Sequence, residues 1–295
     1  MVHLAPESNA WKLINKKEEK HKMNLPKISC YCCTYARDGL LEEAIQSFLM
    51  QDYPGEKELV IVNDHKDQEF VFSHPQVRII NLKERIKDIP AKHRFALSLC
   101  TGDIFKVWDD DDIHLPHALS SIAAGFRNGV YKTAFALIDS KPELELVSGP
   151  FHNAIAFSIM SYVRIGYFCE NVPFDMRLIK GIHAMSKADP FDVPKLGPWY
   201  IYRKFNPDNP YNISRMSFHK PGISDRVDAA IGEVQRTGRI ELNPHWSKPW
   251  GAIAAAALDR REQPKPIHEV DNSFVGLPKM ENKEIQTSCI KEIDG

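Results

Sequence analysis

Four consecutive aspartates, Asp109 to Asp112, follow a short apolar run in the segment FKVWDDDDIHLP. Like charges at this spacing repel one another, so a fold that gathers them at the end of a strand needs a cation to hold them together. Carboxylate oxygens favour Mg²⁺ or Mn²⁺ over zinc, and Mg²⁺ is usually shared between carboxylates and the phosphates of a substrate. The tetrad therefore predicts a metal site that meets a nucleoside diphosphate, with a solvated acidic loop as the alternative.

Strands and helices alternate through the first part of the chain, and they determine where this tetrad lies. Short apolar runs predict strands at 28–34, 58–63, 77–82 and 104–108, and amphipathic runs predict helices at 39–51 and 90–100. Such alternation predicts an α/β fold with a doubly wound, mostly parallel sheet, in which ligands bind beyond the carboxyl ends of the strands. The tetrad is expected at that edge.

The pattern becomes irregular after about residue 130, where shorter strand-like runs follow. Proline and aromatic residues are dense from Pro173 to Pro210, as in long loops that build a binding surface. We therefore expect a region of shorter strands and loops on this side of the molecule. The expected division is a polar extension at 1–25, a first half at 26–130, a second half at 131–260 and a tail at 261–295.

Composition narrows the class of protein. The 295 residues carry a formal net charge of −1, which gives no overall attraction to nucleic acid or to an anionic membrane. No stretch approaches the roughly 20 apolar residues of a membrane span, and the first residues lack the apolar run of a signal peptide. The six cysteines are expected to be buried, reduced thiols. We expect a cytoplasmic protein.

Two segments resemble a known family. The runs ISCYCCTYARDGLLEEAIQSFLMQDYPGEKELVIVNDH and AKHRFALSLCTGDIFKVWDDDDIHLPHAL look like the nucleotide-binding half of a GT-A fold, family 2 glycosyltransferase. Their shared features come in order: a T-Y-x-R turn, an S-x-L-x-Q-x-Y-P helix end, a V-x-D turn, a T-G-D and a D-x-D box before a proline. The resemblance, over roughly 26–120, implies a hexosyltransferase-like enzyme that moves a sugar from a UDP-sugar to an acceptor hydroxyl with inversion. It makes 26–130 the nucleotide-sugar-binding half and 131–260 the acceptor-binding half.

The resemblance also implies which residues meet the donor. Tyr35 and Asp38 border the nucleobase pocket, and Asp64 accepts a hydrogen bond from the base. Lys92 and Arg94 stand in the helix where family members often carry an arginine-asparagine pair. A cation there is expected to meet the sugar or the phosphates.

The same resemblance implies a Mn²⁺ or Mg²⁺ site. Asp109 and Asp111 match the D-x-D pair, with Asp111 as the direct ligand, and Asp110 faces the ribose or the diphosphate. Further along, WYIYRKFNPDNPYNISRMSFH resembles a segment that closes over the donor in some members. It implies that Arg203 reaches the diphosphate and that His219 is a further candidate for the metal. Ordinary surface positions are the alternative for both.

The catalytic base is expected in the second half. The segment IGYFCENVPFDMRLI resembles the acceptor-side stretch in which a carboxylate takes the proton from the attacking hydroxyl. Asp175 is the candidate, with Asp189 and Asp192 as substitutes and a structural ion pair as the alternative role. Phe174 stands where the family usually has its first acidic residue. That difference keeps open a second function, a non-catalytic protein that binds nucleotide sugars.

Two other questions stay open at this point. D-D-D-D-I also fits the nucleophile motif of haloacid dehalogenase phosphatases, although that motif normally ends the first strand and here two strand–helix units precede it. The acceptor is not indicated, and a glycan or a modified DNA base would each supply a hydroxyl. Scattered lysines of the second half would suit an anionic acceptor such as DNA, namely Lys141, Lys180, Lys187 and Lys195.

Overall fold

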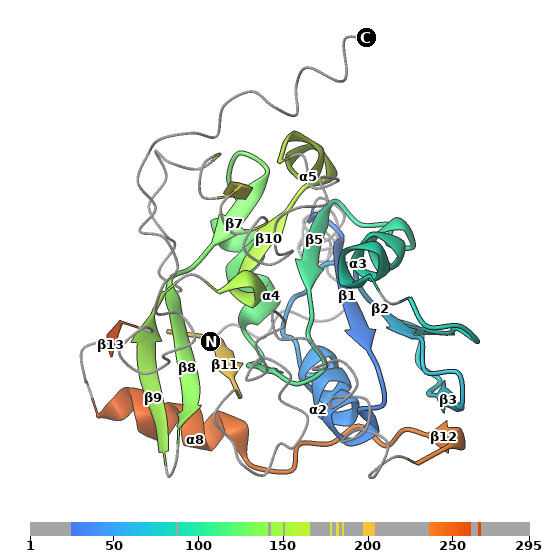
Figure 1. The fold of residues 1–295 in the computed structure, drawn as a ribbon. Helices are drawn as coiled ribbons and strands as arrows, with labels where there is room; N and C mark the ends of the chain where they lie inside the picture. The colour runs from blue at the N-terminus through green and yellow to red at the C-terminus, as the bar shows by residue number, and fades with distance from the viewer. Residues whose placement is uncertain are drawn as a thin grey trace, which may run out of the picture.

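A six-stranded sheet forms the centre of the fold (Figure 1). In the computed structural model its strands lie in the order β4-β2-β1-β5-β10-β7, and the first four run parallel. β10 pairs antiparallel with β5, and β7 pairs antiparallel with β10. The bounds are β1 Ile28–Thr34, β2 Lys57–Asn63, β4 Val77–Asn81, β5 Ile104–Val107, β7 Val130–Lys132 and β10 Ile155–Phe157.

The structure describes most of the first 165 residues and parts of the remainder. The described residues are 25–86, 88–140, 143–149, 151–165, 178, 181–182, 185, 197–203, 236–260 and 265–266. Every strand and helix predicted for the first part of the chain is present, with ends that differ by at most two residues. The predicted mostly parallel α/β sheet is confirmed.

Two helices cover opposite faces of the sheet, as a doubly wound fold requires. The helix α2 (Asp38–Leu49) buries Leu41, Ala44, Ile45 and Phe48 against a cluster that includes Cys30 and Cys32 of β1. The helix α3 (Ile89–Ser98) packs Ala96 and Leu97 against the alternate residue Tyr31. Because side chains alternate between the faces of a strand, β1 is buried on both sides, which explains its continuous apolar sequence.

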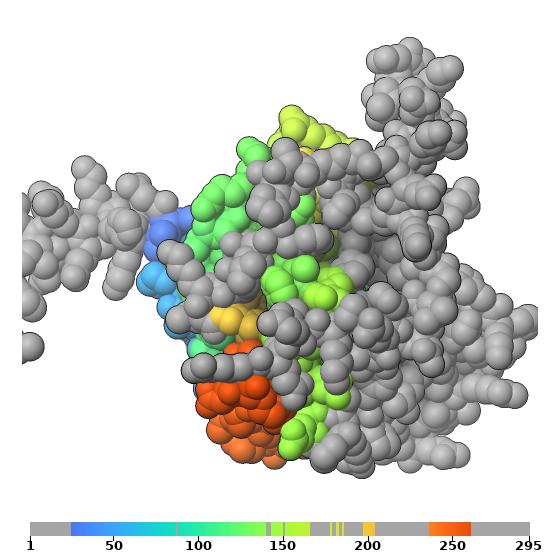
Figure 2. All heavy atoms as spheres, turned by 90° about the vertical axis from the view of Figure 1, so that its left-hand side faces the viewer, coloured from blue at the N-terminus to red at the C-terminus, as the bar shows by residue number. Residues whose placement is uncertain are grey.

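A second sheet lies beside the first, and most of its strands come from the region where the sequence loses its periodicity. Its order is β13-β9-β8-β11-β6, and β6 comes directly after the aspartate tetrad. The helix α8 lies against β9 (Figure 1), and Figure 2 shows α8, in orange, on the surface of the molecule. The bounds are β6 Ile113–His114, β8 Phe135–Ser140, β9 Glu143–Ser148, β11 Tyr200–Tyr202, β13 Lys265–Pro266 and α8 Trp250–Asp259.

Smaller elements complete the described part of the chain. The strand β3 was not predicted, and it pairs in parallel with β12, which lies about 170 residues later in the chain. No helix among the described residues has the length and apolar character needed to cross a bilayer. The bounds are β3 Gln68–Val71, β12 Gly238–Glu241, α4 Ala118–Gly125, α5 Ile159–Arg164 and the 3-10 turn η1 His152–Ala154.

Gly102 allows a close approach of two chain segments just before β5. A Cβ atom at this position would lie 2.6 Å from Ser29 Oγ and 2.7 Å from the carbonyl oxygen of Lys27. Because part of this contact is backbone, we expect Gly102→Ala to lower the free energy of unfolding by about 1–3 kcal/mol, as measured by urea denaturation. Gly39→Ala is the matched control, since no atom lies within 4 Å of a Cβ there and alanine favours a helix. Equal stability of the two variants would contradict this account.

Candidate metal and nucleotide site

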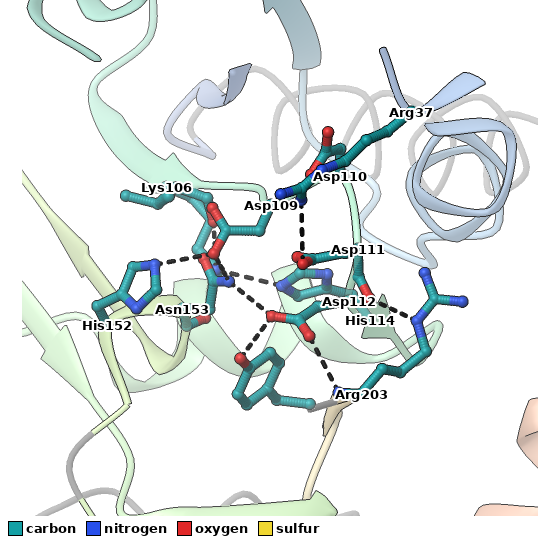
Figure 3. Close-up of polar contacts among 12 residues, drawn as sticks. Arg37, Lys106, Asp109, Asp110, Asp111, Asp112, His114, His152, Asn153 and Arg203 are labelled. Atoms are coloured by element: carbon teal, nitrogen blue, oxygen red, sulfur yellow. Dashed lines mark hydrogen bonds and ion pairs between the residues drawn. The ribbon is translucent and has the colours of Figure 1, made fainter. Parts of the chain in front are cut away.

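The four aspartates lie between β5 and β6, beyond the carboxyl end of a central parallel strand (Figure 3). One carboxylate oxygen from each of Asp109, Asp111 and Asp112 lies within 4.8 Å of the other two. Three hard oxygen donors this close together suit Mg²⁺ or Mn²⁺ and do not suit a soft metal. The residues present therefore fit the metal that the sequence predicted, and Asp112 joins the predicted pair as a third candidate ligand.

Asp112 is held firmly from the second sheet. It is 3% exposed, and its Oδ2 accepts hydrogen bonds from the hydroxyl of Tyr200 at 2.6 Å and from Asn153 Nδ2 at 2.9 Å. Its Oδ1 accepts from the backbone N–H of Arg203 at 3.2 Å. Burial and the nearby Asp109 raise the pKa of Asp112, while these hydrogen bonds lower it. The side chain has little freedom to turn away from the cluster.

Asp109 is held by the turn η1. His152 Nε2 lies 2.8 Å from its Oδ2, and Asn153 Nδ2 donates to the same oxygen. Asn153 thus bridges Asp109 and Asp112 (Figure 3). Burial raises the pKa of Asp109, but His152, His93 and Lys106 together lower it by more, so that the pKa lies below its usual value. Asp109 is therefore ionised and available as a ligand at neutral pH.

A buried lysine on β5 supports the turn η1. Lys106, on β5, is 0% exposed, and its Nζ donates to the carbonyl oxygens of Val107 at 2.6 Å and of Asn153. Its Nζ also lies 3.3 Å from Nε2 of His114, whose ring stacks on Trp108. Burial lowers the pKa of Lys106 to about 8. The lysine joins β5 to η1, and so fixes the position from which Asn153 reaches the carboxylates.

Arg37 contacts the other two aspartates. Its Nη1 donates to Asp110 Oδ1 at 2.8 Å and to Asp111 Oδ2 at 3.1 Å. The arginine follows Ala36, whose φ of 60° lies in the left-handed region, so that the chain turns sharply after β1. Burial raises the pKa of Asp111 to about 7, with Arg37 lowering it and the neighbouring aspartates raising it. Arg37 thus holds Asp110 and Asp111, whereas Asn153 holds Asp109 and Asp112.

Two of the residues predicted for the nucleobase, Tyr35 and Asp64, directly follow the ends of β1 and β2. Asp64 is 1% exposed, and its carboxylate accepts from Lys92 Nζ at 2.5 Å and from the N–H of Ile86 at 2.9 Å. The ring centroids of Tyr35 and His65 lie 4.9 Å apart, and the guanidinium of Arg85 lies 4.1 Å from the Tyr35 ring. The structure therefore brings Lys92 to Asp64 as a buried ion pair.

Three residues that were predicted to bind the nucleotide-sugar donor make contacts within the protein. Asp38, at the start of α2, accepts from Arg236 Nε at 2.5 Å. Arg94 lies 3.5 Å from Asp88 at the exposed start of α3. Arg203 donates from Nε to the backbone oxygen of Asp111 at 2.5 Å and from Nη1 to Glu43. Of these three, Arg203 lies beside the tetrad. Asp175, His219, Asp189 and Asp192 lie outside the described residues.

Comparison with known families identifies the chain. Residues 29–175 match Glycosyl transferase family 2. The chain belongs to that family. This family 2 glycosyltransferase carries its tetrad after β5 and not after β1, which also argues against the phosphatase alternative. The matched range includes most of the two segments that resemble this family, and the match confirms the resemblance.

Two of the solved structures that are similar to this family 2 chain have low sequence identity to it. Residues 1–349 of TarS from Staphylococcus aureus, in complex with UDP-GlcNAc, are 16% identical, with a TM-score of 0.45 and coverage of 86% of this chain and 76% of that one. The mannosyltransferase PcManGT from Pyrobaculum calidifontis, in complex with GDP-Man and Mn²⁺, is 16% identical, with a TM-score of 0.44 and coverage of 84% and 81%. No curated protein matches the chain.

Proposed function

We propose that this glycosyltransferase moves a sugar from a UDP-sugar to an acceptor hydroxyl, with inversion and with Mn²⁺ or Mg²⁺ held by Asp109, Asp111 and Asp112. The observation that supports it best is the gathering of these three carboxylates within 4.8 Å, in a chain of this family. Their place beyond the carboxyl ends of parallel strands is where α/β sheets bind nucleotides.

The residues of the chain have separate tasks in this reaction. When bound, the divalent cation offsets the negative charge that develops on the departing diphosphate. Asn153 and His152 keep Asp109 aligned for binding, and Asn153 and Tyr200 do the same for Asp112.

The donor and the acceptor hydroxyl meet other groups of the chain. Tyr35 offers an aromatic face to the base, and the Asp64–Lys92 pair offers both an acceptor and a donor beside it. Asp175 is the proposed base that takes the proton from the acceptor hydroxyl as the hydroxyl attacks the anomeric carbon. Inversion follows from this single displacement.

Donor hydrolysis tests the proposal without knowledge of the acceptor. A panel of nucleotide sugars is incubated with the protein and Mn²⁺, and then with excess chelator. We expect slow release of sugar from a UDP-sugar that stops when the metal is removed, together with a rise in melting temperature on adding UDP and Mn²⁺. A rise in melting temperature without sugar release, for every donor tested and with acceptors supplied, would favour the non-catalytic binding protein.

The acceptor is proposed more broadly, as a glycan or a modified DNA base. The lysines that suggested DNA lie outside the described residues. Contacts between lysines and phosphates release counterions, so affinity for duplex DNA should fall steeply between low and physiological salt. Affinity that is independent of salt, or that is absent at low salt, would leave the glycan as the acceptor class to test.

A further inference from the structure

One carboxylate oxygen of Asp111 already accepts a hydrogen bond from a cationic side chain. Arg37 Nη1 lies 3.1 Å from Asp111 Oδ2, and the side chain of Asp111 is 19% exposed. A divalent cation at Asp109, Asp111 and Asp112 would therefore lie close to a guanidinium that uses the same carboxylate. Two positive groups on one carboxylate repel each other, so binding of the metal must weaken the bond between Arg37 and Asp111.

Asp110 keeps Arg37 at the site when that bond weakens. Its Oδ1 lies 2.8 Å from Arg37 Nη1, and its Oδ2 is buried without a hydrogen-bond partner in the described part of the chain. Asp110 is 3% exposed and Arg37 is 9% exposed. If the arginine left, a buried carboxylate would lose the cation that neutralises it, which is strongly unfavourable. Arg37 is therefore expected to stay bonded to Asp110.

The turn after β1 limits how far Arg37 can move. Ala36 is 2% exposed and has a φ of 60°, a conformation that alanine adopts only when its surroundings impose it. The next residue after Arg37 begins α2, so the backbone of the arginine lies between a strained turn and a helix. Only the end of the side chain is free to change its partner.

From these contacts we propose that Arg37 exchanges Asp111 for the diphosphate of the donor. The inference rests on the proposed function. Arg37 acts as the counter-ion of Asp111 and Asp110 before the metal binds. Once the metal takes Asp111, the guanidinium stays on Asp110 and directs the released N–H to a phosphate oxygen. It also removes one unit of negative charge from the four aspartates, which lowers their repulsion of a dianionic diphosphate.

The proposal predicts two effects of opposite sign in Arg37→Gln. Without nucleotide, the variant should bind Mn²⁺ about tenfold more tightly than the wild type, because the competing positive charge is gone. With saturating Mn²⁺, the same variant should bind UDP about tenfold more weakly, because a charge-assisted hydrogen bond is lost. Isothermal titration calorimetry measures both affinities. An arginine with only a structural role would weaken both or change neither, and either result would overturn the proposal.

Control variants separate this proposal from the assignment of the metal site. Arg239→Gln removes the same charge from an exposed ion pair with Glu69 and should leave both affinities unchanged. Asp111→Asn should lose Mn²⁺ binding. If Asp111→Asn binds Mn²⁺ like the wild type, the proposed function loses its metal site. If Asp111→Asn loses Mn²⁺ while Arg37→Gln binds it no more tightly, only the role of Arg37 is wrong.

A second substitution covers the case in which Arg37→Gln does not fold. Arg37→Lys keeps the charge but replaces the planar guanidinium, whose N–H groups have fixed directions, by a compact ammonium group on a shorter side chain. It should leave Mn²⁺ affinity within about twofold of the wild type and weaken UDP binding with Mn²⁺ present. Unchanged UDP binding in this variant, or weakening of both ligands, would count against the exchange.

Discussion

Replacing Asp111 by asparagine is expected to reduce Mn²⁺-dependent release of sugar by at least about 100-fold while the protein stays folded. The substitution keeps the size and shape of the side chain but removes the charge that draws a divalent cation. Burial raises the pKa of Asp111 to about 7, which means that the folded protein disfavours its charged form. Neutralising it should therefore leave the free energy of unfolding unchanged or slightly higher.

The combination of lost activity and preserved stability distinguishes a ligand from a structural residue. Activity is measured with a radiolabelled UDP-sugar, and stability by urea denaturation of the same preparation. Asp67→Asn is the control, because this aspartate is exposed and lies 4.0 Å from the side chain of Lys66. The assignment is contradicted if Asp111→Asn keeps full metal-dependent activity, or if its activity falls only because the protein unfolds.

The parallel core was predictable because its signal is local. Each buried strand is a continuous apolar run, and α2 shows its buried face in the spacing of Leu41, Ala44, Ile45 and Phe48. The tetrad was predictable for the same reason, since four adjacent carboxylates are visible in any window of sequence. Arg37 carried a signal too, in the T-Y-x-R turn, but a turn motif does not show which aspartate the arginine contacts.

The groups that hold the tetrad were missed because their contacts are not local. His152 and Asn153 lie more than 40 residues after the aspartates that they contact. They reach the site because β10 pairs antiparallel with β5, with Phe157 opposite Phe105, and so brings η1 to the end of β5. Nothing in the sequence near His152 indicates that pairing.

The sequence also did not indicate which carboxylates two of the predicted donor-binding cations contact within the protein. Lys92 was predicted to meet the sugar or the phosphates, and the structure pairs it with Asp64. Arg203 was predicted to reach the diphosphate, and its guanidinium bonds the buried Glu43. A cation near an anionic ligand and a cation near a buried carboxylate look the same in sequence, because both need only a nearby negative charge.

Glu43 is a buried carboxylate that joins α2 to the last described helix. It is 5% exposed, and besides Arg203 its carboxylate accepts from Ser247 N at 2.8 Å, Ser247 Oγ at 2.6 Å and Trp250 Nε1 at 3.2 Å. Burial alone would raise the pKa of Glu43. Arg203 and these hydrogen bonds lower it by more, so that the pKa lies below its usual value. Glu43 therefore holds the start of α8 and the arginine beside the tetrad in one network.

Substituting Glu43 by alanine is expected to lower the free energy of unfolding by about 3–5 kcal/mol, because Arg203 would be left buried beside an empty space. Guanidinium chloride denaturation measures the loss. Ser247→Ala, which removes one neutral donor from the same carboxylate, should cost only about 1 kcal/mol. A loss below that value in Glu43→Ala would contradict the predicted importance of the ion pair.

The double variant Glu43→Leu with Arg203→Met tests the cause of this loss. Removing both charges together also removes the burial cost of each, so the double variant should recover most of the stability that Glu43→Ala loses. The backbone N–H of Arg203 would still donate to Asp112, whereas its Nε would no longer reach the backbone oxygen of Asp111. Metal affinity that survives in a stable double variant would mean that the second sheet aligns Asp112 through its backbone, and that the arginine side chain serves stability.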